Sequence, residues 1–309
     1  MEKVSVLLAV YCPEKRYLEE QLKSLDCQTY ENMEILIFDD SVGERCEERV
    51  FQQCLKHKPY RILPYKENNL GYVKAFEYLT EQSDGAYVAF CDQDDVWDKR
   101  KIEKCVECLN RDKTLLVATD RKLIDENGKV ICPSVRRSSK SPSENWNTYD
   151  DIGKANFFLC HAPGMSLVAR GDFVRSTVPF SRYTGHDKWL ISCACAVGKV
   201  SYLDQPLVSY RRHGNNVSGV LVGIHSKKDY REKRVLPHLK LIQEFSRRYP
   251  EYKGCKEALA FAQARMKHDI PKILKYRSLA PDLAKFEIFL AFMPEFAVKM
   301  CIRILQSKK

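Results

Sequence analysis

The sequence predicts an α/β fold in which a mainly parallel central sheet is flanked by helices and followed by a helical C-terminal extension. Short apolar runs of strand length alternate with segments that have helical spacing, a pattern typical of βαβ units with right-handed crossovers. Acidic residues follow two of the apolar runs, and ligands of such sheets bind beyond the carboxyl ends of the strands. These observations predict a functional site at one edge of the sheet.

The individual elements follow from the apolar pattern. Residues 4–11 form a continuous apolar run and are expected to be a buried strand, whereas Leu18, Leu22 and Leu25 within 14–28 have the spacing of a helix. The same two patterns then alternate. Further strands are expected at 33–38, 61–65 and 86–89, and helices at 44–56, 69–82 and from about 98 onward.

Composition places the chain among globular proteins with one large domain or two smaller ones. Its 309 residues are 44% hydrophobic, which supplies a sizeable core. We expect no secretory signal and no transmembrane helix, because the N-terminus leads directly into a strand and no stretch reaches about 18 apolar residues. The 13 cysteines lack framework spacing, which favours a reducing compartment, and we expect a cytoplasmic protein.

Positive charge is concentrated near the C-terminus. Residues 1–224 contain 31 Lys and Arg against 32 Asp and Glu, whereas residues 225–309 contain 20 against 9. Such a segment suits contact with anionic lipid, nucleic acid or an acidic partner. We do not expect nucleic acid, because aromatic and basic residues are not interleaved there as in base-stacking modules.

Three carboxylates follow the strand expected at 86–89, at Asp92, Asp94 and Asp95. Acids this close repel one another unless a cation or donor groups lie between them. Magnesium is usually held by one or two carboxylates together with substrate phosphates, so the cluster indicates a metal site. The alternative is a solvated turn that caps the next helix, although a cap needs only one Asp.

Asp39 and Asp40 follow the second strand. They cap the next helix, or they accept hydrogen bonds from the ribose or base of a nucleotide. The sequence has neither GxGxxG after the first strand nor GxxxxGK[ST] anywhere, which argues against a dinucleotide fold and a P-loop. A carboxylate-bound metal is then the available means of holding phosphates.

The order of these motifs resembles family 2 glycosyltransferases of the GT-A fold, and in particular the rhamnosyltransferase-like branch of bacterial cell-surface polysaccharide synthesis. The resemblance covers residues 1–219, which we expect to be the catalytic domain, with 220–309 as a basic helical extension. The matching segments are 4–11, Asp39-Asp40-Ser41, Asn69-Leu70-Gly71, Asp92-Gln93-Asp94-Asp95-Val96-Trp97, 161–166, Gly185-His186-Asp187 and Tyr210-Arg211-Arg212-His213-Gly214-Asn215-Asn216.

The resemblance implies a donor side and a metal, Mn²⁺ or Mg²⁺. Asp92 and Asp94 match a DxD-type element in which Asp94 binds the metal, and His213 is a further metal ligand or a pyrophosphate contact, with a surface His as the alternative. The nucleotide-binding residues implied or suggested by position are Tyr11, Asp39, Asp40, Asn69, Asp92, Arg211 and Arg212.

An acceptor side is implied as well. Asp187 matches the catalytic base, with a helix N-cap as the alternative. The family often has Glu-Asp here, and this chain has His186-Asp187, which leaves the role of the preceding residue open. The acceptor or sugar pocket is expected to include Asp95, Trp97, Gly164, Met165 and His186. For Trp97 a buried aromatic is the alternative, and for 161–166 a plain turn before a strand.

The implied activity is an inverting transfer of rhamnose or a similar hexose from a dTDP- or UDP-sugar to a glycan or lipid-linked glycan. A nucleotidyltransferase of similar fold is an alternative, but it needs a basic glycine-rich loop after the first strand. A non-catalytic glycan-binding or scaffold protein is another, but it would have lost the acids, which are all present.

The C-terminal segment 285–305 is apolar, with Lys308 and Lys309 after it and a helix-kinking Pro294 inside. It suits a helix that lies in the interface of a membrane, which would place the protein peripherally on the inner face. The alternative is a helix that packs on the catalytic domain or on a second subunit of an oligomer.

Overall fold

The computed structural model describes residues 1–214 and 223–307, so Asn215, Asn216 and the expected domain boundary at 219–220 lie outside the described residues. The chain forms two compact units. Unit 1 comprises Met1–Asp150 and His161–His213, and unit 2 comprises Asp151–Cys160 and Gly214–Lys309. The segment Asp151–Cys160 belongs to unit 2 although it lies within the range expected for the catalytic domain.

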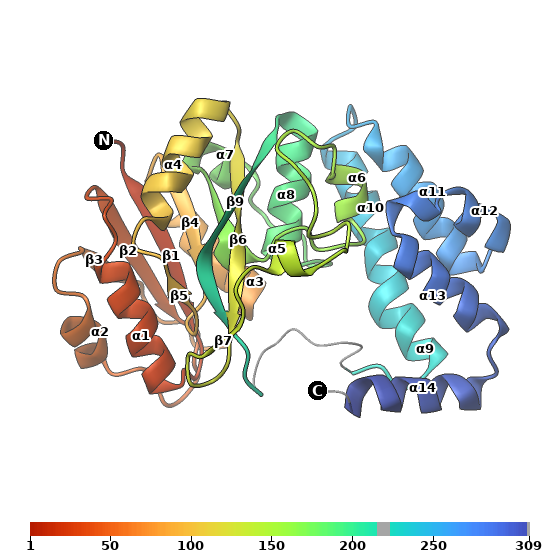
Figure 1. Cartoon of the computed structure of the whole chain (residues 1–309), viewed down its shortest axis with the longest axis horizontal. Helices are drawn as coiled ribbons and strands as arrows, with labels where there is room; N and C mark the ends of the chain where they lie inside the picture. The colour runs from red at the N-terminus through yellow and green to blue at the C-terminus, as the bar shows by residue number, and fades with distance from the viewer. Residues whose placement is uncertain (215–222, 308–309) are drawn as a thin grey trace. The chain divides into compact units, whose positions relative to one another are not determined.

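Unit 1 contains both strands and helices (Figure 1). Its strands are β1 (Val4–Val10), β2 (Met33–Asp39), β3 (Tyr60–Ile62), β4 (Tyr87–Cys91), β5 (Val96–Trp97), β6 (Leu116–Ile124), β7 (Val130–Cys132), β8 (Leu167–Arg170) and β9 (Val200–Arg211). Its helices are α1 (Lys15–Asp26), α2 (Glu48–Cys54), α3 (Tyr72–Glu81), α4 (Lys101–Asp112), α5 (Val135–Ser138), α7 (Gly171–Ser176) and α8 (His186–Val197), with a 3₁₀ turn η1 at Gly164–Ser166. From β1 to β4 the strands and helices alternate in the order that the apolar pattern predicts, whereas β4 is followed directly by β5 and β6 directly by β7.

The sheet is parallel in its first part and mixed afterwards. Its order among the described residues is β3-β2-β1-β4-β8-β6-β9-β5, with β7 paired to β6. Strands β1 to β4 are parallel neighbours as expected, but β8 is antiparallel to both β4 and β6, and β5 is antiparallel to β9. Strand β6 is again parallel to β9, so most of the paired residues lie in parallel strands. The expectation of a mainly parallel sheet is confirmed, with β5, β7 and β8 as short antiparallel additions.

This topology brings the end of β9 to the edge where β4 ends. Strand β8 is antiparallel to both β4 and β6, so β6 runs in the same direction as β4. Strand β9 is parallel to β6 and therefore also runs in the direction of β4. Within the first half, register pairs Val10 with Asp39 and Leu8 with Cys91. The residues that follow β1, β2, β4 and β9 are thus expected to meet at one edge.

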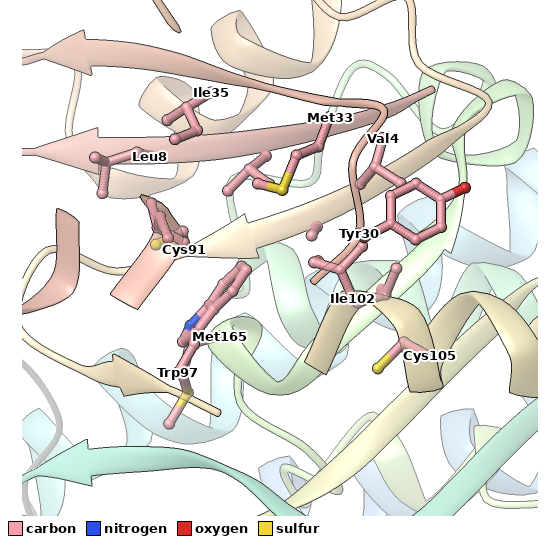
Figure 2. Packing of buried hydrophobic residues seen from close by; sticks show 14 of the residues in the cluster. Val4, Leu8, Tyr30, Met33, Ile35, Cys91, Trp97, Ile102, Cys105 and Met165 are labelled. Carbon is pink, nitrogen blue, oxygen red and sulfur yellow. The ribbon is translucent and has the colours of Figure 1, made fainter. Parts of the chain in front are cut away.

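Helices cover both faces of the sheet. The even positions of β1, such as Val4 and Leu8, lie in one buried cluster with Ile102 of α4 (Figure 2). Leu18 and Leu22 of α1 belong to the same cluster. On the other face the ring of Phe76 in α3 meets Phe90 of β4 at 5.6 Å between centroids. Burial on both faces explains why the strands are continuous apolar runs.

Unit 2 is helical. Its elements are α6 (Gly153–Asn156), α9 (Lys227–Tyr230), a π-helical turn η2 (Arg231–Val235), α10 (Leu236–Arg248), α11 (Gly254–Lys267), α12 (Ile270–Lys275), a 3₁₀ turn η3 (Arg277–Leu279), α13 (Pro281–Phe292) and α14 (Glu295–Ser307). The segment 151–160 is anchored by aromatic contacts, with Phe157 against Phe245 and Phe158 against Phe261. No helix in the described part of the chain is long and apolar enough to cross a membrane.

Candidate functional site

The acidic loop between β4 and β5 is the centre of the candidate site. Asp92 and Asp94 are partly exposed, whereas Asp95 is fully buried. The three acids do not cap α4, which begins at Lys101 after Arg100 with no side-chain cap. The capping alternative is therefore not what the structure has.

The end of β9 binds this loop through Arg211, whose side chain is fully buried. Its backbone N–H donates to Asp95 Oδ1 at 3.1 Å, and its Nε donates to the Asp94 carbonyl oxygen at 2.9 Å. The guanidinium also pairs with Glu20 of α1 and lies over the ring of Tyr17. Arg211 thus holds the acidic loop from inside the protein, whereas its neighbour Arg212 is exposed.

His213 reaches the same loop from the surface side. Its Nε2 lies 2.8 Å from Asp94 Oδ2, and its ring is tilted on Tyr17 with 5.2 Å between centroids. The structure therefore brings together the two residues that the resemblance implies as metal ligands. An imidazole nitrogen and a carboxylate oxygen suit a divalent ion such as Mn²⁺.

Negative charge in this region is only partly compensated. The pKa of Asp92 is raised to about 7, first by burial and then by the charges of Asp94 and Asp187. Burial, and then the charges of Asp94 and Asp92, raise the pKa of Asp95 well above its ordinary range, and its Oδ2 has no hydrogen-bond partner among the described residues. A bound cation would relieve this repulsion.

The donor set fits a metal that a substrate helps to hold. Among the described residues no group of three or more His, Cys, Asp or Glu side chains is placed to bind a metal ion. Asp94 and His213 offer two ligands, and Mg²⁺ in particular is commonly held by one or two carboxylates plus substrate phosphates. The residues present therefore fit a cation completed by a diphosphate.

The acids after β2 hold two neighbouring loops. Asp39 accepts from the backbone N–H groups of Ser41 at 2.9 Å and Cys46 at 2.8 Å. These bonds keep 40–47 out of the helix expected to begin at 44, so that α2 starts only at Glu48.

Asp40 holds the residues before α3. It accepts from the N–H groups of Leu70 and Gly71 at 2.7 and 2.8 Å and from Asn69 Nδ2 at 2.9 Å. The acids therefore do not cap the next helix, α2, as the alternative had it; Asp40 instead binds the loop that leads into α3. Tyr11, the first residue after β1, is exposed; its backbone N–H donates to the Gln93 side-chain oxygen, and its carbonyl oxygen accepts from the Gln93 side-chain NH₂.

Asp187 lies in the first turn of α8, where the N-cap is Gly185. Its Oδ1 accepts from the Lys188 N–H at 2.7 Å, and its side chain is partly exposed. Asp187 is close enough to Asp92 for its charge to raise the pKa of that carboxyl. The structure therefore places the implied base within electrostatic reach of the DxD-type element.

His186 is a buried packing residue. Its ring lies 4.1 Å from that of Phe76 and 5.1 Å from that of Phe90, and burial lowers its pKa to about 4. Gly164 approaches it so closely that a Cβ there would lie 2.3 Å from His186 Nε2. This contact explains the glycine: the turn η1, which leads directly into β8, can rest on the His186 ring only without a side chain.

Trp97 and Met165 lie in the core of unit 1 (Figure 2). For Trp97 this is the buried-aromatic alternative. The sequence analysis missed Lys101, which is fully buried, lies 3.1 Å from the centroid of the Trp97 ring, and donates to the Met165 carbonyl oxygen at 2.7 Å. Burial lowers the pKa of Lys101 to about 8. One feature of the sequence could have predicted the burial of Lys101: it lies next to Ile102, on the apolar side of an otherwise amphipathic helix.

Comparison with known proteins agrees with this geometry. The chain superposes on the crystal structure of Staphylococcus aureus TarS 1-349 in complex with UDP-GlcNAc with a TM-score of 0.60 and 16% identity, covering 93% of this chain and 84% of that one. The curled α/β sheet flanked by helices is thus a GT-A type fold. Residues 5–162, just over half of the chain, match the glycosyl transferase family 2. The chain belongs to this family.

Two relatives show the range of similarity. An uncharacterized glycosyltransferase of Nostoc sp. (strain PCC 7120 / SAG 25.82 / UTEX 2576) is 29% identical over 217 residues, which are 69% of this chain and 66% of that protein. The dTDP-rhamnosyl transferase RfbG of Shigella flexneri is 27% identical over 230 residues, which are 68% of this chain and 73% of that protein. The chain thus spans slightly less than two thirds of the Nostoc protein.

Proposed function

We propose that this protein is an inverting glycosyltransferase that moves a sugar from a nucleoside-diphosphate donor to an acceptor hydroxyl. The observation that carries the proposal is the meeting of Asp94, His213, Asp92 and Asp187, which come from three distant segments, at one edge of the sheet. Membership of glycosyl transferase family 2 supports it. The alternative activities of the fold lack a comparable observation in their favour.

The donor binds at the ends of β1, β2 and β4. Asp39 and Asp40 hold the loops that border the nucleotide, and Tyr11 and Asn69 are exposed beside them. Asp94 and His213 would hold a Mn²⁺ or Mg²⁺ ion, which would supply positive charge for the diphosphate leaving group. Arg212, which is exposed, is available for the phosphate oxygens.

Asp187 is the general base. It takes the proton of the acceptor hydroxyl, whose oxygen attacks the anomeric carbon while the bond to the diphosphate breaks on the opposite side. One displacement inverts the anomeric centre and needs no covalent intermediate on the enzyme. The turn η1, supported by His186 and Lys101, borders the acceptor side.

The sugar is rhamnose or a similar hexose carried by dTDP or UDP, and the acceptor is a glycan or lipid-linked glycan of a cell-surface polysaccharide. The relative from S. flexneri is named a dTDP-rhamnosyl transferase, and a relative from Bacillus subtilis is named a putative teichuronic acid biosynthesis glycosyltransferase. We further propose that the protein works peripherally on the inner face of a membrane, where a lipid-linked acceptor would lie.

A screen of dTDP- and UDP-sugars tests the proposal. Each donor is added with and without Mn²⁺, and both thermal unfolding and release of nucleoside diphosphate are measured. A true donor raises the melting temperature and releases nucleoside diphosphate. Binding without release from any donor and acceptor would identify a non-catalytic binder, and release of pyrophosphate from a nucleoside triphosphate and a sugar phosphate would identify a nucleotidyltransferase.

A further inference from the structure

The last two helices of unit 2 each have one buried face. Leu290 of α13 and Val298 and Ile302 of α14 pack with Ile224 and Tyr230 in an apolar cluster. This face therefore packs within unit 2 itself, which is neither of the two partners that the packed-helix alternative named, the catalytic domain and a second subunit. Deletion of the tail would open this cluster, so point substitutions are the better probe.

A second face of the same helices is apolar and open. Its four large side chains, which we call the aromatic face, are Phe289 (44% exposed), Phe292 (77%), Phe296 (75%) and Met300 (58%). The pairs on each helix are three and four residues apart, so they lie on one side of their helix. Large apolar side chains scattered singly are normal on a surface, but four exposed ones within residues 289–300, paired on two successive helices, indicate an interaction site.

Basic residues border the aromatic face. Lys285 lies one turn before Phe289 with its side chain 78% exposed, and Lys299 is exposed beside Met300. The nearby acids are engaged: Asp282 lies 3.4 Å from the Lys285 ammonium, and Glu295 accepts from the Lys227 N–H. The sequence adds Arg303, Lys308 and Lys309 to the segment.

We propose that the aromatic face docks on an anionic lipid surface. The inference deepens the peripheral membrane contact of the proposed function and rests on it. An interfacial helix places aromatic side chains among the acyl chains while flanking lysines meet anionic headgroups. A second copy of this chain is a less suitable partner for the aromatic face. Residues 225–309 carry 20 Lys and Arg against 9 Asp and Glu, so two such segments would repel one another.

The test is co-sedimentation of the full-length protein with vesicles, either of phosphatidylcholine alone or of phosphatidylcholine with phosphatidylglycerol. We expect binding to the anionic vesicles only, and weaker binding at high salt. The double variant Phe292→Ser/Phe296→Ser should bind at least about tenfold more weakly, because each buried Phe contributes a large apolar area. The matched control Val130→Ser/Ile131→Ser removes two exposed apolar side chains from β7 of unit 1 and should bind as the wild type does.

A charge variant, Lys285→Glu/Lys299→Glu, keeps the aromatic face and reverses two positive charges, so it tests whether binding depends on the charge of the lipid or on apolar contact alone. It should also lose binding. Equal binding of wild type and Phe variant, or equal binding to both vesicle types, would overturn the proposal. The proposal would also be overturned if the wild type were a dimer that binds no vesicles and the Phe variant were a monomer. Donor turnover with a soluble acceptor should be unchanged in all variants, so loss of the proposed activity and loss of the lipid contact are distinguishable.

Discussion

His213 Nε2 lies 2.8 Å from Asp94 Oδ2, although 119 residues separate the two in the sequence. The pair forms because β9 runs parallel to β6 and ends at the edge where β4 ends. Neither residue alone identifies a metal site. Together, beside the crowded acids Asp92 and Asp95, they mark the position at which we propose that a cation and a diphosphate are held.

The first prediction concerns Asp94→Asn. The amide keeps the size of the side chain and loses its charge, so the rise in melting temperature that UDP or dTDP produces with Mn²⁺ should largely disappear. The melting temperature without ligand should change little, because Asp94 is partly exposed. Asp84→Asn is the control, since Asp84 is exposed and pairs with Lys3 away from the loop. Identical nucleotide binding in EDTA and Mn²⁺ by the wild type would show that donor binding needs no metal.

The second prediction separates two adjacent arginines. Arg211→Met removes a fully buried guanidinium that binds the Asp94 carbonyl oxygen and Glu20, and leaves that carbonyl without its donor, so the free energy of unfolding should fall by roughly 1–3 kcal/mol. Arg211→Lys should not restore it, because an ammonium lacks the fork of donors.

Arg212→Met should instead leave the free energy of unfolding within about 0.5 kcal/mol of wild type, since Arg212 is exposed. Its affinity for nucleoside diphosphate should drop, because an available phosphate contact is lost. Urea denaturation and calorimetric titration measure the two effects. If Arg211→Met unfolded like the wild type, the role of Arg211 in holding the acidic loop would be refuted.

The first half of the fold could be predicted because its information is local. The apolar runs of β1, β2 and β4 and the acids after them are visible in short windows, and the parallel order follows from alternation. The position of β8 between β4 and β6, antiparallel to both, could not be predicted from the sequence, because these pairings join segments that are far apart in the chain.

The same limit applies to the site. Asp94 and His213 could be named from motifs, but the burial of Arg211, Lys101 and Trp97 depends on partners from other segments. A charged residue at the end of a strand or the start of a helix is ordinarily exposed. Only the tertiary structure shows that Arg211 and Lys101 are enclosed behind the acids.

The third prediction is that Gly164→Ala destabilises the protein. The new methyl would lie 2.3 Å from His186 Nε2, and the His186 ring is held by Phe76 and Phe90, so neither side can move freely. Such overpacking typically costs about 1–3 kcal/mol. Gly214→Ala is the matched control, because a methyl there meets no described atom within 4 Å. Equal melting temperatures for the two variants would mean that the contact between η1 and His186 is not rigid.

The last prediction is that Asp187 carries the proton transfer and not donor binding. Asparagine can keep the hydrogen bond from the Lys188 N–H to Oδ1, so the first turn of α8 should remain intact in Asp187→Asn. It cannot accept the acceptor's proton as a carboxylate does, and turnover should fall by about 10²–10⁴-fold with little change in nucleotide affinity. Asp172→Asn is a close control: Asp172 is an exposed acid in the first turn of α7 that accepts from the next backbone N–H in the same way. Near-wild-type turnover of Asp187→Asn, or parallel loss of rate and nucleotide binding, would remove Asp187 from the role of base. Asp95 would be the next acid to test, although its full burial makes it poorly placed to meet an acceptor.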